Sequence, residues 1–379
     1  MATPTLVIQN FAQIEEVSLE LGDLTVLVGP QGTGKSLALQ WLKIALDGKQ
    51  IVGALRDAGQ DNPSALIDFI FGVGMGSAWR SDSSVRFEDK AVTPRNLARL
   101  GGSEGRVFFI PAHRSMLISD GWAAPFQKLS PETPVVARLF SQTLFDLFSG
   151  NKSDTLFPRD RVLKKVYRDL INDAVFHGGT VGIDEDKQHT KRLELTHGTA
   201  QLPFMTWTAG QREFTPLLLG LYHLLPSRKL LKQPGIDWVV IEEPEMGLHP
   251  QAVSVFMLLV LDLLWRGYRV VLSTHSPLVL TAVWMLRRLR DLDARWSLVC
   301  QGFGVTGAQQ GEIKTVAKAA LTKSMRAHFL GFDGKKVRSK DISSLDPADE
   351  DDDIAGWGGL TGFGSRFADA VRSAVNEAG

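Results

Sequence analysis

The sequence contains a single cysteine, Cys300, among its 379 residues. An internal disulfide and a cysteine-rich zinc site are therefore excluded, which fits a reducing compartment, and we expect a cytoplasmic protein. A net charge is also lacking, because 42 Lys and Arg residues balance 42 Asp and Glu residues. The chain as a whole is therefore not attracted to nucleic acid or to an anionic membrane, so any such contact requires a local basic patch.

Long hydrophobic runs are absent as well. The N-terminal stretch "MATPTLVIQNF" lacks the basic start and long apolar core of a signal peptide. Later apolar stretches are interrupted, by "THSP" or by Asp262, before the roughly 20 residues that span a bilayer. We find no internal repeats and no sustained heptads. These absences predict a soluble globular protein without a membrane partner.

What is present is an alternation of buried strands and helices. "TLVIQNFAQIEEVSLEL" predicts two short strands, Leu24 to Val28 a buried strand, and the next segment a helix that ends near Gly48. Further buried strands are expected in "RVFFIP", "IDWVVIEEPE" and "RVVLSTHSP", and a hairpin in "GTVGIDED" and "KRLELTHG". Helices are expected in "LLLGLYHLL" and "AVSVFMLLVLDLLWRG". This order predicts an α/β fold with a largely parallel sheet.

Two segments interrupt this alternation, and a third follows it. Residues 51–105 and 112–176 are interpreted as mostly helical insertions in a domain that covers residues 1–305. Residues 306–379 form a C-terminal extension, in which "HFLGFDGKKVRS" predicts an edge hairpin and the last segment an amphipathic helix. The extension either contacts another subunit or packs on the same domain. The acidic run Asp349 to Asp353 is expected to be a solvated loop rather than a metal site.

The stretch "GPQGTGKS" satisfies the phosphate-binding pattern G-x-x-x-x-G-K-[ST] between a predicted strand and a predicted helix. Its glycines let backbone N–H groups turn toward phosphate oxygens at a helix N-terminus. Lys35 should bridge the β and γ phosphates of ATP, and Ser36 should bind Mg²⁺. The residues expected to hold the nucleotide are Gly29, Pro30, Gln31, Gly32, Thr33, Gly34, Lys35 and Ser36.

Two further groups lie at the carboxyl ends of predicted strands, where such sheets bind ligands. "WVVIEEP" ends in two carboxylates, and we assign Glu242 to the metal and Glu243 to the base that activates water. His275 follows "VVLST". A lone histidine there is more often structural, but the same edge carries the glycine loop and the acids, so we assign His275 to the γ-phosphate.

A second glycine turn, "TWTAGQRE", occurs far from the first. Thr208 and Gln211 have the spacing of a capping box, so the turn should open a helix whose N–H groups are left uncovered at Gly210. This predicts a second anion site. Pro216 either kinks this helix or marks the start of the next one.

The four motifs, in this order, resemble the ABC-type ATPase superfamily, with "TAGQ" in the place of the family's signature "SGGQ". The resemblance implies that Thr208, Gly210 and Gln211 act on the ATP of a neighbouring subunit. Lys35, Ser36, Glu242 and Glu243 would then act in their own subunit, with His275 as switch histidine. This sequence departs from the family at Glu242, because the family usually has Asp at the position of the metal ligand. The family's glutamine loop has no clear equivalent; His113 and Arg114 after "FFIP" either do a related job or are surface residues.

"EPEMGLHP" and the strands before the glycine loop resemble the soluble branch that contains RecF-like and overcoming-lysogenization-defect (OLD)-like ATPases. "FFIPAHRS", "WTAGQREF" and "WGGLTGF" are similar to the ATPase subunit of the PARIS anti-phage system. This resemblance implies a homo-oligomeric scaffold that holds a separate Toprim-type nuclease effector and releases it when a phage trigger protein is sensed. No strand ends in Glu-Gly, as a Toprim nuclease would need, so we expect any nuclease on another chain.

Three alternatives remain open. A RecF- or SMC-like repair ATPase would share the ATP site but bind duplex DNA, with "RRLRDLDAR" and "KKVRSK" as its candidate basic surfaces. The nucleotide-binding subunit of a transporter would share the motifs, although "EPEMGLHP" and the insertions argue against it. The protein could also bind ATP as a switch with little hydrolysis.

Overall fold

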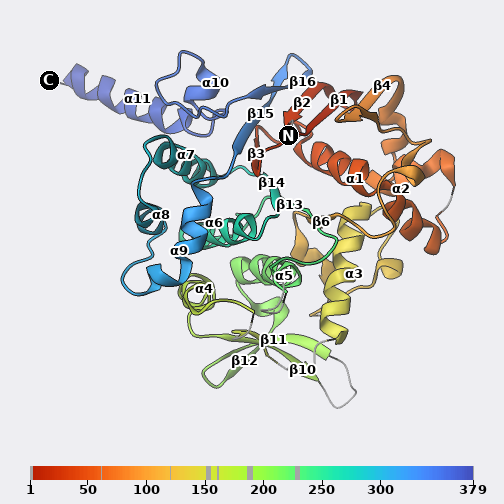
Figure 1. The fold of residues 1–379 in the computed structure, drawn as a ribbon, viewed down its shortest axis with the longest axis horizontal. Helices are drawn as coiled ribbons and strands as arrows, with labels where there is room; N and C mark the ends of the chain where they lie inside the picture. The colour runs from red at the N-terminus through yellow and green to blue at the C-terminus, as the bar shows by residue number, and fades with distance from the viewer. Residues whose placement is uncertain are drawn as a thin grey trace.

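The computed structural model describes residues 3–60, 62–119, 121–150, 155–159, 162–185, 191–226 and 231–378. Its centre is a ten-stranded sheet with the strand order β5-β4-β1-β2-β16-β15-β3-β14-β13-β6 (Figure 1). The strands of this sheet are β1 (Thr5–Phe11), β2 (Ile14–Glu20), β3 (Leu24–Val28), β4 (Trp79–Phe87), β5 (Lys90–Ala91), β6 (Val107–Ile110), β13 (Trp238–Glu242), β14 (Arg269–Ser273), β15 (Met325–Asp333) and β16 (Lys336–Asp341).

One half of the sheet is parallel and carries the motifs. Strands β15, β3, β14, β13 and β6 run in the same direction, so the carboxyl ends of β3, β13 and β14 lie at one edge. The other half is antiparallel in β1–β2, β1–β4 and β4–β5, and β16 joins the halves by pairing antiparallel with β15 and parallel with β2. The predicted α/β fold is thus confirmed, with its parallel strands next to the predicted sites.

Helices cover both faces of the sheet. Because successive side chains of a strand point to opposite faces, Val26 and Val28 belong to one core and Leu27 to the other. The helices are α1 (Lys35–Asp57), α2 (Leu66–Phe71), α3 (Val135–Gly150), α4 (Lys165–Ile171), α5 (Ala209–Leu224), α6 (Pro250–Trp265), α7 (Pro277–Asp291), α8 (Trp296–Gly302), α9 (Gln309–Ala320), α10 (Asp352–Ala355) and α11 (Gly362–Ala378). Helices α1 and α2 contribute to the core of Leu27, whereas α5, α6, α7, α8 and α9 contribute to that of Val26.

The first helix breaks where the sequence predicts its end, next to Gly48. Asp47 has a non-helical φ of −129°, and a second helical segment follows the break and continues α1 to Asp57. The Asp47 carboxylate accepts hydrogen bonds from the backbone N–H groups of Arg106 (2.7 Å) and Val107 (2.9 Å) at the start of β6. These long-range hydrogen bonds tie the break in the helix to β6, and sequence periodicity does not reveal them.

The two insertions are less helical than predicted. Residues 79–91 form β4 and β5 of the main sheet, which the sequence pattern conceals because only Val85 and Phe87 of β4 are buried. The second insertion holds α3 and α4, and also the short strands β7 (Ile118–Ser119), β8 (Trp122–Ala123) and β9 (Thr155–Phe157).

The predicted hairpin is present within a smaller, four-stranded antiparallel sheet. Strands β10 (Thr180–Glu185) and β11 (Lys191–His197) pair with each other, and β12 (Ala200–Pro203) and β9 complete the order β12-β11-β10-β9. The predicted first hairpin strand extended to Asp186, and that residue lies outside the described ranges, as do Asp160 and Arg161 of the predicted helix that contains α4.

For the C-terminal hairpin, an edge position and packing on the same domain were both left open, and the structure shows the second: the hairpin lies inside the main sheet. Strand β15 lies between β3 and β16, and its register places Phe329 opposite Val28, directly before the glycine loop. Asp351 begins α10 and, with Asp353, contacts Lys340, so part of the acidic run is tied to β16. Helix α11 extends beyond the sheet at the C-terminal end of the chain (Figure 1).

Candidate functional site

The carboxyl end of β3 continues into a tight turn at residues 29–34. Gly29 has a φ of +147°, and a Cβ atom there would lie 2.1 Å from the carbonyl oxygen of Leu330 in β15. Gly34, with a φ of +83°, directly precedes α1. Both positions therefore require glycine. The backbone N–H groups at the start of a 23-residue helix form the kind of cradle that binds phosphate.

Lys35 folds back over this turn. Its Nζ donates hydrogen bonds to the carbonyl oxygens of Gly29 (2.8 Å) and Pro30 (2.9 Å), and the residue is 6% exposed. Burial lowers the pKa of the Lys35 amino group, and the carboxylates of Glu243 and Glu245 oppose that shift. The lysine predicted to contact phosphate is thus held at the turn by polar groups that phosphate oxygens could replace. Of the remaining turn residues, Thr33 is buried, whereas Gln31, Gly32 and Ser36 are exposed.

Ser36 and Glu242, the two predicted metal ligands, lie together. Burial raises the pKa of the Glu242 carboxyl above its usual range, while hydrogen bonds from the Ala112 N–H and the Ser36 side chain oppose this. Oε2 accepts from Ala112 N at 3.1 Å, whereas Oε1 has no hydrogen-bond partner among the described residues. A buried carboxylate oxygen without a partner, beside a hydroxyl, fits a divalent cation.

No group of three or more His, Cys, Asp or Glu side chains in the described ranges could hold a metal by itself. A cation at Ser36 and Glu242 would therefore take its other ligands from phosphate oxygens and water, which is how Mg²⁺ usually binds in nucleotide sites.

Glu243 and His275 also meet at this edge. The distance from His275 Nε2 to Glu243 Oε1 is 3.5 Å, and both side chains are about one-third exposed (31% and 32%). Glu243 has a φ of +41°, and its N–H donates to the carbonyl oxygen of Ser273 at 3.0 Å. The predicted base and the predicted γ-phosphate residue therefore come from adjacent parallel strands and face one another.

Two further residues of this edge were not assigned from the sequence. Glu245 Oε1 accepts hydrogen bonds from Thr274 Oγ1 (2.8 Å) and from the His275 N–H (2.6 Å), so it fixes the loop that carries the histidine. Its signal was the third acid of "EEPE". Arg114 is 0% exposed, which rules out the surface alternative for this residue, whereas His113 is exposed.

The second glycine turn forms a separate hollow. Thr208 caps α5, and the capping box with Gln211 is complete: Thr208 Oγ1 accepts from Gln211 N, and Gln211 Oε1 accepts from Thr208 N. A Cβ atom at Gly210 would lie 2.9 Å from the carbonyl oxygen of Gly247. Helix α5 continues through Pro216 without ending.

This hollow has a volume of about 340 Å³ and is lined by Ala174, Val175, His177, Thr208, Ala209, Gly210, Gln211, Gly247, Leu248, His249 and Ala252. None of the P-loop residues 29–36 lines it. Within one chain, the two glycine turns thus line different surfaces.

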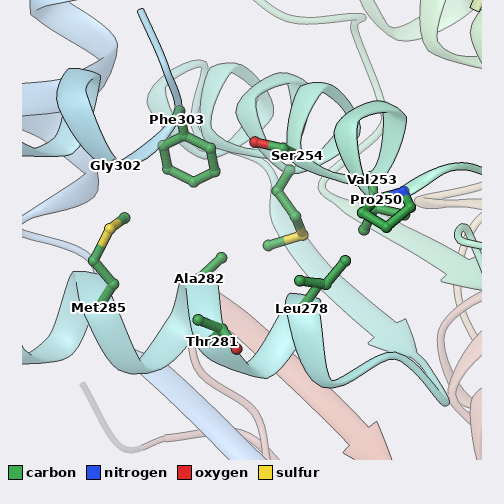
Figure 2. A pocket seen from close by; sticks show the side chains of 10 residues that line it. Pro250, Val253, Ser254, Leu278, Thr281, Ala282, Met285, Gly302 and Phe303 are labelled. Atoms are coloured by element: carbon green, nitrogen blue, oxygen red, sulfur yellow. The ribbon is translucent and has the colours of Figure 1, made fainter. Parts of the chain in front are cut away.

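Another cavity, of about 140 Å³, lies between α6 and α7 (Figure 2). Figure 2 shows Leu278, Ala282 and Met285 of α7 facing α6, with Phe303 at one end. Its lining is mainly apolar and includes no charged side chain. It lacks the groups that would bind a phosphate.

Together, the P-loop, the acidic strand end, the histidine after the next strand and the capped glycine turn define an α/β P-loop NTPase fold whose motifs resemble those of ABC-type ATPases. The family model described as "AAA domain, putative AbiEii toxin, Type IV TA system" matches residues 24–281, more than half of the chain. The chain belongs to this family.

Two curated relatives are named as OLD nucleases. The one from Escherichia phage P2 is 22% identical over 344 residues, which cover 73% of this chain and 56% of the relative. The one from Thermus scotoductus is 27% identical over 321 residues, which cover 72% of this chain and 58% of the relative. The chain thus spans little more than half the length of these relatives.

Solved structures similar to this chain include SMC head domains. A head bound to the C-winged helix domain of ScpA has a TM-score of 0.46 and 10% identity, covering 90% of this chain and 97% of that one. The head domain from Thermotoga maritima has a TM-score of 0.37 and 12% identity, covering 90% and 99%. In the described residues, no helix is both long and apolar enough to cross a bilayer.

Proposed function

We propose that the protein binds and hydrolyses ATP between paired subunits, with the P-loop of one subunit and the second glycine turn of the other on the same nucleotide. The supporting observation is that Lys35, Ser36, Glu242, Glu243 and His275 gather at one edge of the sheet, while Thr208, Gly210 and Gln211 line a different surface. A second copy related by twofold symmetry could bring its glycine turn to this edge.

Each residue then has a chemical role in its own or the neighbouring subunit. Lys35 and the turn N–H groups bind the β and γ phosphates, and the start of α5 of the neighbour adds donors on the far side. Glu243 accepts a proton from the attacking water, and His275 contacts the γ-phosphate and orients Glu243. Bound at Ser36 and Glu242, Mg²⁺ would neutralise charge on the phosphates.

Mixing two inactive variants tests this arrangement. Lys35→Ala removes the P-loop lysine, and Gln211→Ala alters the second turn, so each alone should lose hydrolysis. In a mixed pair, one site combines the intact P-loop of one subunit with the intact turn of the other. Equal mixing should then restore about a quarter of wild-type hydrolysis, because half of the pairs are mixed and each has one complete site. Gln301→Ala, at an exposed position of α8, serves as control.

The absence of any recovery in the mixture, with both variants folded and self-associating, would contradict a shared site. The solution mass in the presence of Mg²⁺ and ATP tests independently whether subunits pair around the nucleotide, because the wild type should then form a larger assembly than Lys35→Ala.

At the cellular level, we propose a homo-oligomeric scaffold of an anti-phage system of the PARIS type, which holds a separate Toprim-type nuclease effector until a phage trigger protein is sensed. Support comes from "FFIPAHRS", "WTAGQREF" and "WGGLTGF", and from relatives named as nucleases. Co-expression with the neighbouring gene product should yield a stable complex. Separate elution of the two proteins under conditions where the oligomer is intact would count against a scaffold.

DNA binding is the competing function, and the basic stretches give it little support. In "KKVRSK", Lys336 and Arg338 pair with Glu15 at 3.3 and 2.9 Å, and Lys340 pairs with Asp353 at 3.0 Å. In "RRLRDLDAR", Arg287 donates to the carbonyl oxygen of Met325. Steep loss of duplex binding with salt would restore this alternative, because phosphate contacts release counterions.

A further inference from the structure

Arg114 is a fully buried cation whose hydrogen bonds all go to backbone carbonyls. Nε donates to Glu213 (3.0 Å) in α5. Nη1 donates to Pro111 (3.1 Å) and Glu242 (3.1 Å), and Nη2 donates to Glu243 (3.3 Å) and Pro244 (3.4 Å). A guanidinium has five N–H donors, so every one of them is used here.

The charge of this arginine is balanced by nearby acids. Glu213 Oε2 lies 3.9 Å from Arg114 Nε, and the carboxylates of Glu242, Glu243 and Glu245 also act on the guanidinium. Burial lowers the pKa of Arg114, and these four carboxylates oppose the shift. A buried cation is costly unless it is paired and fully hydrogen-bonded, and Arg114 is both.

The contacts join two parts of the site that the chain keeps apart. Three accepting carbonyls belong to the turn at residues 242–244, where Glu243 has its uncommon φ of +41°. A non-glycine residue stays in that region only where its surroundings fix it. Another accepting carbonyl, that of Glu213, lies two residues after Gln211 in the first turns of α5. The Ser115 hydroxyl also donates to the Glu213 carboxylate. One side chain therefore holds both the start of α5 and the turn that carries Glu243.

We propose that Arg114 is a positioning residue that couples the second glycine turn to Glu243 within each subunit. This inference rests on the function proposed above. When the neighbour's nucleotide engages residues 208–211, the start of α5 moves or stiffens, and Arg114 transmits this to the carbonyls of residues 242–244. Glu243 then reaches its working position only in paired subunits, so hydrolysis depends on assembly.

The test compares Arg114→Lys with the wild type over a range of protein concentrations. Lysine keeps the charge but has three donors instead of five, so the link between α5 and the turn is broken. We expect ATP half-saturation to stay within about threefold, because the P-loop is not altered, and pairing by solution mass to persist. The rise in hydrolysis per subunit on pairing should fall roughly 10²-fold, as expected for a misplaced catalytic group.

Arg138→Lys is the matched control. Arg138 is also a buried arginine, 1% exposed, and it bonds to Gln60 and lies over the ring of Phe126, away from the acids. Its variant should keep the full rise in hydrolysis on pairing. If Arg114→Lys does not fold, Glu213→Gln tests the same link from α5, because it removes the carboxylate but keeps the carbonyl that accepts from Nε; it should lower the rise several-fold.

The outcomes separate the two proposals. A wild type whose hydrolysis rises on pairing, with Arg114→Lys and Glu213→Gln rising equally, overturns the coupling and leaves the shared site intact. A wild type whose hydrolysis does not rise with concentration overturns the shared site and the coupling with it. Loss of the rise in Arg114→Lys while nucleotide binding and pairing persist confirms the coupling.

Discussion

At the scale of single residues, the two adjacent acids at the end of β13 differ in their surroundings. Glu242 is 5% exposed, beside Ser36, whereas Glu243 is about one-third exposed and faces His275. A carboxylate that must accept a proton from water needs such access, and one that holds a cation does not. The two neighbours are thus suited to different tasks.

Replacing Glu243 by Gln should lower the rate of ATP hydrolysis by roughly 10²–10⁴-fold, since the amide cannot accept a proton. ATP binding should remain, because Lys35, Ser36 and Glu242 are unchanged, and the ATP-bound assembly should accumulate. Phosphate release and solution mass measure the two effects. Glu104→Gln, at an exposed site, is the control. Unchanged hydrolysis in Glu243→Gln would remove this residue as the base.

A buried histidine in the sheet predicts sensitivity to acid. His328 is 2% exposed, and its Nε2 lies 2.9 Å from the carbonyl oxygen of Glu20. Burial lowers the pKa of His328; the contact with Glu20 and the carboxylate of Asp341 oppose this, and Arg326 adds to it. Since the unfolded chain binds the proton near pH 6.5, stability is present above that pH and is lost as the pH falls toward the folded-state pKa.

In His328→Gln, the side-chain amide can still donate to the carbonyl of Glu20 but cannot titrate. The free energy of unfolding of the wild type should fall by up to about 1.4 kcal/mol per pH unit below pH 6.5 from this group, and the variant should lack that part of the slope. Denaturant titrations at several pH values provide the measurement, with the exposed His197→Gln as control. Equal slopes in wild type and His328→Gln would show that His328 titrates normally.

At the scale of elements, the helix after the P-loop is tied to the sheet at its break. Lys43, one turn before Asp47, donates from Nζ to Asp47 Oδ2 (2.7 Å), Gln50 Oε1 (2.9 Å) and the carbonyl oxygen of Val107 (2.8 Å), and both Lys43 and Asp47 are buried. The pair ties α1 to the amino end of β6, at the edge of the sheet opposite the acids.

Asp47→Ala should therefore cost about 3–5 kcal/mol of stability, because it leaves Lys43 buried without its counter-charge and the backbone N–H groups of Arg106 and Val107 without an acceptor. Chemical denaturation of Asp47→Ala against the wild type measures this. Asp57→Ala, at the exposed end of the same helix, should change the free energy of unfolding by less than about 0.5 kcal/mol. A loss near that of the control would mean that the pair contributes little.

The elements that the sequence predicted well are those specified by neighbouring residues. The strand before the P-loop, the capping box at Thr208 and the strand that ends in Glu242 are local patterns, and the structure contains all three. Strand β4 was missed because its polar residues hide the alternation of a strand. The contacts of Asp47 with residues 106–107 and of Arg114 with Glu213 and residues 242–244 were missed because these partners lie 59 to 130 residues away. Local patterns carry no information about such distant partners.

At the scale of the whole molecule, the C-terminal segment has two parts with opposite degrees of burial. Strands β15 and β16 lie inside the main sheet, and the carbonyl of Leu330 in β15 sets the space available at Gly29 of the P-loop. Helix α11, by contrast, has Phe367, Val371 and Val375 on one face, and they are 58%, 65% and 64% exposed. The first part is thus built into the sheet, whereas the apolar face of the second is mostly exposed.

Two truncations should separate these parts. Ending the chain after Thr361 removes α11, and because its apolar face is mostly exposed, the thermal midpoint should change by no more than about 2 °C. Ending it after Thr322 removes β15 and β16 as well. Strands β2 and β3 then each lose one of their two neighbours and the sheet is split in the middle, so that chain should not fold cooperatively. Calorimetry distinguishes the outcomes. A large drop in the thermal midpoint of the chain that ends after Thr361 would instead mean that α11 packs on the body of the protein. A cooperative transition in the chain that ends after Thr322 would mean that β1, β2 and β4 form an independent unit.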